Sequence, residues 1–366
     1  MHMATVPLND LGRISADTLN AISDDIAQVL SSGWFLKGPH TAELERTLAS
    51  RHHGRPVLAV ANGTDALYVA LRSLEIGPGS HVATVANAGG YTTGVLTRLN
   101  ATPVLVDVDR HSAQMSIESL TKTIESHSLD AVVVTHLYGL IGKVDEISAL
   151  CARHNIPLLE DCAQAMGAVL HGSAAGTFGD IATTSFYPTK NLGAFGDGGA
   201  VICKDSSLFE KAASIAQYGW SDRYVVTTSG GINSRLDEIQ AVVLLHLEPQ
   251  LDSDNSQRRA IVQRYAESLS GSRRMIFDDS PKFIGHLAVM ITDSRNSDAE
   301  QLGEHGIATG IHYPVPDHQQ PAWTDLVLAE DLINTEWLAE RTLTLPCFPE
   351  MTESEIEHVT KALAML

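Results

Sequence analysis

Short apolar runs alternate with amphipathic stretches between Val57 and Cys203. The apolar runs, which are typical of buried strands, are residues 57–62, 81–86, 103–108, 131–136, 156–161, 181–186 and 200–203. The stretches between them that carry apolar residues at helical spacing are residues 64–74, 92–99, 116–126 and 144–154. Strands that are apolar throughout are covered on both faces, so this region predicts a mainly parallel α/β sheet.

The pattern changes after Asn233. Residues 234–253 predict one long helix, residues 256–269 a second helix, and residues 286–292 a strand, before a proline-rich stretch at 311–323. We therefore expect a second, smaller α+β domain. The predicted divisions are an N-terminal segment that packs near the small domain (1–25), the large α/β domain (26–250) and the small C-terminal domain (251–366).

Ligands of parallel α/β sheets bind beyond the carboxyl ends of the strands. This rule selects residues 62–64, Asp107, His136, Asp161 and residues 185–190 as candidates. His136 has an equally good alternative interpretation as a hydrogen-bonded core histidine.

Lys190 stands in the glycine-rich stretch SFYPTKNLGAFGDGGA, residues 185–200. Because its neighbours are small, other groups can approach the amine closely, and we expect the amine to lie in a partly dry site. A desolvated amine has a lowered pKa and is nucleophilic towards carbonyl groups. The GDGGA part precedes a predicted strand, so it does not have the context of a dinucleotide-binding loop.

A phosphate site is predicted where the first strand gives way to a helix, at Gly63 and Thr64. Free backbone N–H groups and the helix dipole favour an anion there. Ser185 can add a hydroxyl group from a neighbouring strand end. The alternatives are that Thr64 only caps its own helix and that Ser185 is a turn residue.

Asp161 ends an apolar strand, where a carboxylate is costly unless it meets a cation or hydrogen-bond donors. A protonated heterocyclic nitrogen would suit it, and Gln164 can donate a hydrogen bond into the same place. The alternative is an aspartate that caps a loop. The adjacent pair His52 and His53 is typical of a loop, and we expect no metal site.

Composition limits the partners. The 366 residues carry 25 basic and 44 acidic side chains and a net charge of −19, which disfavours nucleic acid and anionic membranes. Four cysteines without a CxxC pair indicate reduced thiols. No signal-peptide pattern and no apolar run of ~20 residues is apparent, so we expect a cytoplasmic protein with no membrane partner.

Taken together, the motifs resemble those of the DegT/DnrJ/EryC1/StrS sugar aminotransferases, which are fold-type-I pyridoxal-phosphate enzymes. The motifs occur in order along almost the whole chain: SGWFLKGP (32–39), NGTDALYVAL (62–71), ATPVLVDVD (101–109), HLYG (136–139), EDCAQAMGA (160–168), the Lys190 stretch, INSRLDEIQAVVL (232–244), IHYPVPDHQQPAW (311–323) and LPCFPEMTESEIEHV (345–359). The resemblance implies a pyridoxal 5′-phosphate cofactor, which becomes pyridoxamine phosphate in the first half-reaction and is regenerated in the second.

The resemblance also implies a role for each matching residue. Lys190 would bond covalently to the cofactor aldehyde, and Asp161 would pair with the ring nitrogen. Gln164 would bind the phenolic oxygen of the ring. The phosphate would be held by Gly63, Thr64, Ser185 and, from the neighbouring subunit, Asn233. That last role implies a homodimer with shared active sites.

One position departs from the family pattern. Many relatives place an aromatic residue against the cofactor ring where a gapless alignment puts Gly89. We expect Tyr91 to supply this ring instead. Tyr187, His312 and Tyr313 are candidate contacts of the sugar, or else ordinary packing residues.

The resemblance implies ping-pong transfer of an amino group from an amino acid, L-glutamate by family habit, to a keto-sugar carried on a nucleotide diphosphate. An alternative acceptor is a keto-cyclitol of an aminoglycoside pathway. A sugar dehydratase would carry histidine in place of Lys190, and a pyridoxal-phosphate-binding regulator would need a basic DNA-binding module. Both are disfavoured by the sequence.

Overall fold

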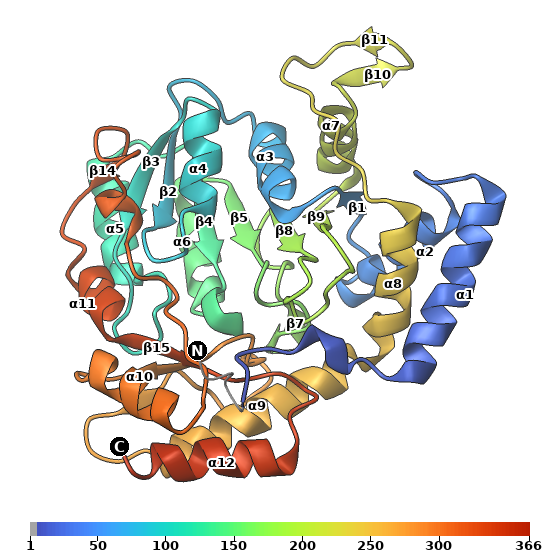
Figure 1. Cartoon of the computed structure of the whole chain (residues 1–366). Helices are drawn as coiled ribbons and strands as arrows, with labels where there is room; N and C mark the ends of the chain where they lie inside the picture. The colour runs from blue at the N-terminus through green and yellow to red at the C-terminus, as the bar shows by residue number, and fades with distance from the viewer. Residues whose placement is uncertain (1–5) are drawn as a thin grey trace.

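The structure, a computed structural model, describes residues 6–366. A central eight-stranded sheet is sandwiched between helices, and a smaller sheet with its own helices lies below it in the view of Figure 1. The strands of the large sheet, in spatial order, are β1 (Val57–Val60), β9 (Gly199–Cys203), β8 (Ile181–Ser185), β5 (Leu158–Asp161), β4 (Ala131–Thr135), β2 (His81–Val85), β3 (Thr102–Val106) and β14 (Leu328–Ala329).

The large sheet is mainly parallel, as predicted. Only β9 runs antiparallel to its neighbours β8 and β1. The carboxyl ends of the other strands therefore meet at one edge of the sheet. The seven predicted strands are confirmed, and β14 joins the sheet from the last third of the chain.

Helices cover both faces of this sheet (Figure 1). One face packs against α3 (Gly63–Ser73), α4 (Tyr91–Arg98) and α7 (Ser206–Ala216). The other packs against α2 (Pro39–Arg51), α5 (Ile117–Ser126) and α6 (Val144–His154). The four predicted helices of this region are α3 to α6. The burial of both sheet faces explains why the strands are apolar throughout.

The C-terminal part forms an antiparallel sheet of β12 (Arg274–Met275), β13 (Ala288–Ile291) and β15 (Thr342–Leu345). Its helices are α9 (Leu251–Ser268), α10 (Arg295–Glu304), α11 (Ile333–Arg341) and α12 (Glu353–Leu363). The remaining elements are η1 (Leu11–Arg13), α1 (Ala16–Ser32), η2 (Leu137–Gly139), β6 (Val169–Leu170), β7 (Ser173–Ala174), β10 (Trp220–Asp222), β11 (Val225–Val226), α8 (Glu238–Leu247), η3 (Glu248–Gln250) and η4 (Asp317–Gln319).

The prediction of one helix over residues 234–253 is wrong. The helix α8 begins at Glu238, and the short 3-10 helix η3, which contains Pro249, separates it from α9. Proline has no N–H to donate and clashes with the preceding turn, so the α-helical bonding pattern is interrupted there. The second predicted helix is longer than expected, because α9 begins at Leu251.

The N-terminal segment contacts the last part of the chain. The N–H of Val6 donates to the carbonyl of Gly306 at 3.0 Å, and Arg13 forms a bidentate ion pair with Glu355 on α12 at 2.6 and 2.7 Å. Residues 1–5 of the predicted 1–25 segment lie outside the described residues. The proposed domain divisions stay predictions. Within residues 6–366, no helix combines the length and the apolar character needed to cross a bilayer.

Glu238 joins two distant parts of the chain. Its carboxylate is buried and accepts the N–H groups of Gly38, His40 and Thr41, each at 2.9 Å, at the first turn of α2. A carboxylate at a helix N-terminus meets both free N–H groups and the positive end of the helix dipole. Segment 34–41 is therefore anchored to α8.

We expect Glu238→Ala to lower the free energy of unfolding by about 2–3 kcal/mol, because the buried N–H groups of Gly38 and Thr41 and the half-buried one of His40 lose their acceptor. The measurement is the midpoint of urea unfolding, with the exposed Glu210→Ala on α7 as the control. Equal midpoints for the two variants would show that Glu238 does not anchor the segment.

Candidate functional site

A cavity of about 770 Å³ lies at the edge where the parallel strands end. Of the residues to which the family resemblance assigns a role or a sugar contact, all but one line it: Gly63, Thr64, Tyr91, Asp161, Gln164, Ser185, Tyr187, Lys190, His312 and Tyr313. The exception is Asn233, which lies outside the cavity and accepts a hydrogen bond from the side chain of Arg235. The structure thus brings these residues together, while their individual roles stay predictions.

The start of α3 forms one end of the cavity. The side chain of Asn62, and not that of Thr64, caps the helix by accepting the N–H of Asp65 at 2.8 Å. A Cβ atom on Gly63 would lie 2.7 Å from Cβ of Ser185, so only glycine allows the two strand ends to approach this closely. The helix N-terminus and the serine hydroxyl therefore form one site suited to a phosphate group.

Asp161, the last residue of β5, is only 5% exposed. Burial raises the pKa of its carboxyl group, although the N–H of Ala163 and the charge of Lys190 oppose this shift. The only backbone N–H that the carboxylate accepts among the described residues is that of Ala163, at 3.1 Å. A buried carboxylate with so few donors fits a further cationic N–H group.

Lys190 follows β8 in a tight loop. Its N–H donates to the carbonyl of Tyr187 at 2.8 Å, and a Cβ atom on Gly193 would lie 2.4 Å from the carbonyl oxygen of Pro188. Burial lowers the pKa of the Lys190 amine, and the charge of Asp161 opposes this shift. Desolvation thus favours the neutral, nucleophilic amine, as the sequence predicted.

Gln164 is oriented by the backbone. Its Oε1 accepts the N–H of Tyr138 at 2.6 Å, and its Nε2 donates to the hydroxyl of Tyr313 at 3.3 Å. The ring of Tyr313 meets that of Tyr91 edge to face, with centroids 6.4 Å apart. A Cβ atom on Gly89 would lie 2.9 Å from the Tyr313 ring, which explains why no aromatic side chain occupies position 89.

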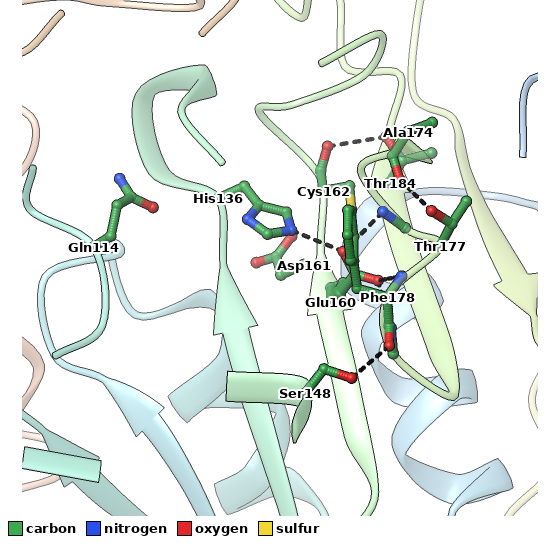
Figure 2. A network of polar contacts seen from close by, with 12 residues as sticks. Gln114, His136, Ser148, Glu160, Asp161, Cys162, Ala174, Thr177, Phe178 and Thr184 are labelled. Atoms are coloured by element: carbon green, nitrogen blue, oxygen red, sulfur yellow. Dashed lines mark hydrogen bonds and ion pairs between the residues drawn. The ribbon is translucent and has the colours of Figure 1, made fainter. Parts of the chain in front are cut away.

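Glu160 precedes Asp161, is itself fully buried and points to the opposite side, into a network of polar contacts (Figure 2). One carboxylate oxygen accepts the N–H groups of Phe178 and Gly179, both at 2.7 Å. The other accepts the N–H of Gly176 at 2.9 Å and lies 3.0 Å from Nε2 of His136. Burial would raise the pKa of Glu160, but the hydrogen bonds from His136 and the backbone outweigh it, so the pKa is lowered.

His136 is therefore a core residue and does not line the cavity, so its selection as a site residue is wrong. The potential ligand atoms of His136, Glu160 and Cys162 lie within 4.8 Å of one another. However, the carboxylate already has four donors, and burial raises the pKa of the Cys162 thiol. The cluster has the geometry of a hydrogen-bonded network.

Asp107 is also structural, although it ends a strand run. Its carboxylate accepts the N–H groups of Asn334 and Thr335, at 3.0 and 2.8 Å, at the start of α11. The strand-end rule could not exclude it, because its partners lie more than 220 residues away.

The sequence did not single out His286, which lines the cavity beside Lys190 and is 6% exposed. It stands just before β13 in a run that was predicted only as a strand. The feature that could have identified it is a polar residue directly before an otherwise apolar strand.

The arrangement fits pyridoxal phosphate. The α3 start and Ser185 suit its phosphate, the buried carboxylate of Asp161 suits its ring nitrogen, and the amine of Lys190 suits its aldehyde. These three groups come from three different strand ends that face one cavity.

Comparison with known proteins agrees with this chemistry. The family model described as "DegT/DnrJ/EryC1/StrS aminotransferase family" matches residues 17–364. A UDP-N-acetyl-3-dehydro-α-D-glucosamine 3-aminotransferase of Acidithiobacillus ferrooxidans is 37% identical over 361 residues, which cover 98% of this chain and 97% of the relative.

Two solved structures share the fold. Streptomyces venezuelae DesV in complex with a ketimine intermediate has a TM-score of 0.92 and 33% identity, over 100% of this chain and 98% of DesV. NtdA of Bacillus subtilis with the bound cofactor PMP also has a TM-score of 0.92, at 26% identity, over 99% of this chain and 85% of NtdA.

We expect Asp161→Asn to lower the pKa of Lys190 further, because the variant removes the negative charge that stabilises the ammonium form. An ammonium group is unreactive, so the amine should become reactive at lower pH than in the wild type. The measurement is acylation of Lys190 in cofactor-free protein across a pH series, quantified by mass spectrometry against the same peptide from unfolded protein. A midpoint equal to or above that of the wild type would refute the coupling.

Proposed function

The chain belongs to the DegT/DnrJ/EryC1/StrS aminotransferase family, and on that premise we propose that it transfers the amino group of L-glutamate to the ketone of a nucleotide-linked sugar. It is a pyridoxal-phosphate-dependent aminotransferase. The observation that most supports the proposal is the meeting of Lys190, Asp161 and the Gly63–Ser185 contact in one cavity. The nucleotide-linked acceptor is supported by the substrate named for the A. ferrooxidans relative.

When bound, pyridoxal phosphate supplies an aldehyde that bonds reversibly to amines and a protonated ring that withdraws electrons. Asp161 holds the proton on the ring nitrogen by accepting its hydrogen bond. Gly63, Thr64 and Ser185 bind the phosphate, and Gln164 donates to the phenolic oxygen. Tyr91, at the start of α4, lines the same cavity and would help to hold the ring.

Lys190 moves the proton. Its neutral amine would carry a proton from the α-carbon of the amino acid donor to the cofactor in the first half of the cycle, and from the cofactor to the carbon that carried the ketone of the acceptor in the second half. Burial lowers the pKa of this amine and so keeps it competent as a base. Tyr187, His312 and Tyr313 line the remaining part of the cavity and contact the sugar.

The active enzyme is a homodimer in this proposal. Asn233 lies outside its own cavity, as a residue that serves a partner's phosphate site would. Large apolar side chains are exposed on the same chain and offer a surface for a second copy: Trp34, Phe35, Phe195 and Tyr224. Tyr224 lies between β10 and β11, in a hairpin that projects from the body of the molecule (Figure 1). The four cysteines are buried and free, in keeping with a cytoplasmic location.

The proposal is tested with a panel of nucleotide keto-sugars and glutamate, in which formation of 2-oxoglutarate is followed. We expect turnover with one or more keto-sugars, and an absorption band near the visible edge in the purified enzyme. Lys190→Ala should lose the band and slow turnover by about 10³-fold or more, because the base is absent. Turnover of keto-inositols alone would refute the nucleotide-sugar proposal, and normal turnover by Lys190→Ala would refute the mechanism.

Shared sites predict that two inactive variants complement each other. In refolded mixtures of Lys190→Ala and Asn233→Ala, half of the dimers are mixed and each has one complete site, so we expect about one quarter of wild-type activity. The assay is run at limiting cofactor, where loss of Asn233 weakens the phosphate site. Lys190→Ala mixed with Asp161→Ala is the control without a complete site. Equal activity of both mixtures would contradict a shared site.

A further inference from the structure

The ring of His286 faces the same cavity as Lys190, but its environment differs from that of the predicted contacts. A chain of side-chain amides reaches it from the core. In that chain, Nδ2 of Asn255 donates to the carbonyl of Met166 at 3.1 Å. Oδ1 of Asn255 accepts from Nδ2 of Asn191 at 2.6 Å.

This chain determines which nitrogen of His286 carries a proton. A backbone carbonyl oxygen can only accept a hydrogen bond, so the amide nitrogen of Asn255 must be the atom that faces the carbonyl of Met166. In the same way, the carbonyl of Ile284, 3.3 Å from Nδ2 of Asn191, fixes the orientation of the Asn191 amide. Oδ1 of Asn191 is then the atom 2.8 Å from Nδ1 of His286. Because this oxygen can only accept, Nδ1 must be the donor.

The imidazole is also held neutral. Burial lowers the pKa of His286 well below its ordinary value, and the positive charges of Lys190 and Arg258, together with His312, add to this effect. A neutral imidazole that is protonated at Nδ1 carries a lone pair at Nε2. Within residues 6–366, no group donates a hydrogen bond to that nitrogen. It is an acceptor without a protein partner on the wall of the cavity.

The chemistry of the two substrates distinguishes which one supplies the donor. The carboxylates of an amino acid only accept hydrogen bonds, so they cannot donate one to Nε2 of His286. The amino group of the amino acid reacts at the cofactor. A sugar offers hydroxyl groups that donate. A site with a fixed acceptor selects ligands with a matching O–H group, because the acceptor is left unpaired otherwise.

We propose that Nε2 of His286 accepts a hydrogen bond from a hydroxyl group of the sugar acceptor and so helps to select the sugar. This inference rests on the proposed function and adds a specificity-determining residue to it. Asn191, which directly follows Lys190, acts through His286 as a positioning residue.

Two variants separate the acceptor from the anchor. His286→Asn keeps a donor near the position of Nδ1 for Asn191 but has no atom at Nε2. His286→Gln places an amide oxygen near Nε2 and loses the bond to Asn191. We expect His286→Asn to lower kcat/KM for the keto-sugar roughly tenfold and His286→Gln to recover part of that loss. His52→Asn is the control, since His52 is an equally buried histidine whose Nδ1 bonds to the Leu48 carbonyl away from the cavity.

The half-reactions are measured separately. With glutamate alone, His286→Asn should form pyridoxamine phosphate at a rate within about twofold of the wild type, since the amino acid makes no bond to Nε2. Deoxy analogues of the active sugar, each without one hydroxyl, complete the test. For one of these analogues, kcat/KM of the wild type should be lower than for the full sugar, whereas His286→Asn should use the analogue and the full sugar equally well. Unchanged kinetics in His286→Asn with impaired His286→Gln would show an anchor only and overturn the proposal.

A readout without cofactor or turnover completes the experiment. The apoenzyme is labelled with ¹⁵N-histidine, and the signals of His286 are assigned as those that disappear in His286→Asn. At neutral pH these signals should show an unprotonated, pyridine-like Nε2 and a protonated Nδ1. A protonated Nε2 would overturn the inference. If the wild type aminates no keto-sugar in the panel, the proposed function fails instead, and the NMR result still reports the tautomer.

Discussion

Two neighbouring carboxylates are buried at the end of β5, and each needs hydrogen-bond donors or a cation to be stable there. Alternation along the strand sends Glu160 and Asp161 to opposite sides. Glu160 meets four donors, three of which are backbone N–H groups of loop 176–179, and so holds this loop against β5 (Figure 2). Asp161 meets one backbone N–H and faces the cavity. The same chemical group is thus structural on one side and available to a ligand on the other.

The close approach of three chain segments completes the cavity around Asp161. A Cβ atom on Gly199 would lie 2.6 Å from the carbonyl group of Asn62, just as one on Gly63 would meet Ser185. These two glycines let the start of α3 pack directly against β8 and β9. An anion site made of backbone N–H groups and a hydroxyl follows from this packing and needs no basic side chain.

The pattern of apolar residues was sufficient to predict the strands of the large sheet and the edge at which they end. It did not distinguish Asp161 from Asp107 or His136, because all three end apolar runs and their partners are distant in the sequence. The resemblance selected Asp161, Lys190, Gly63, Thr64 and Ser185, which the structure brings together at one cavity, while their roles stay predictions. His286 escaped both approaches, since its significance lies in the amides of Asn191 and Asn255, which only the folded chain aligns.

Basic side chains are sparse in the cavity, whereas three aspartates line it: Asp65, Asp161 and Asp197. Among the described residues that line it, Lys190 is the single lysine or arginine. Burial and the charge of Lys190 keep the pKa values of His286 and His312 low, so neither imidazole competes with the amine for a positive charge. The state of Lys190 therefore depends on burial, which favours the amine, and on Asp161, which favours the ammonium. A ligand that occupies Asp161 with its own N–H group weakens the second influence and so favours the amine form that the transfer of a proton requires.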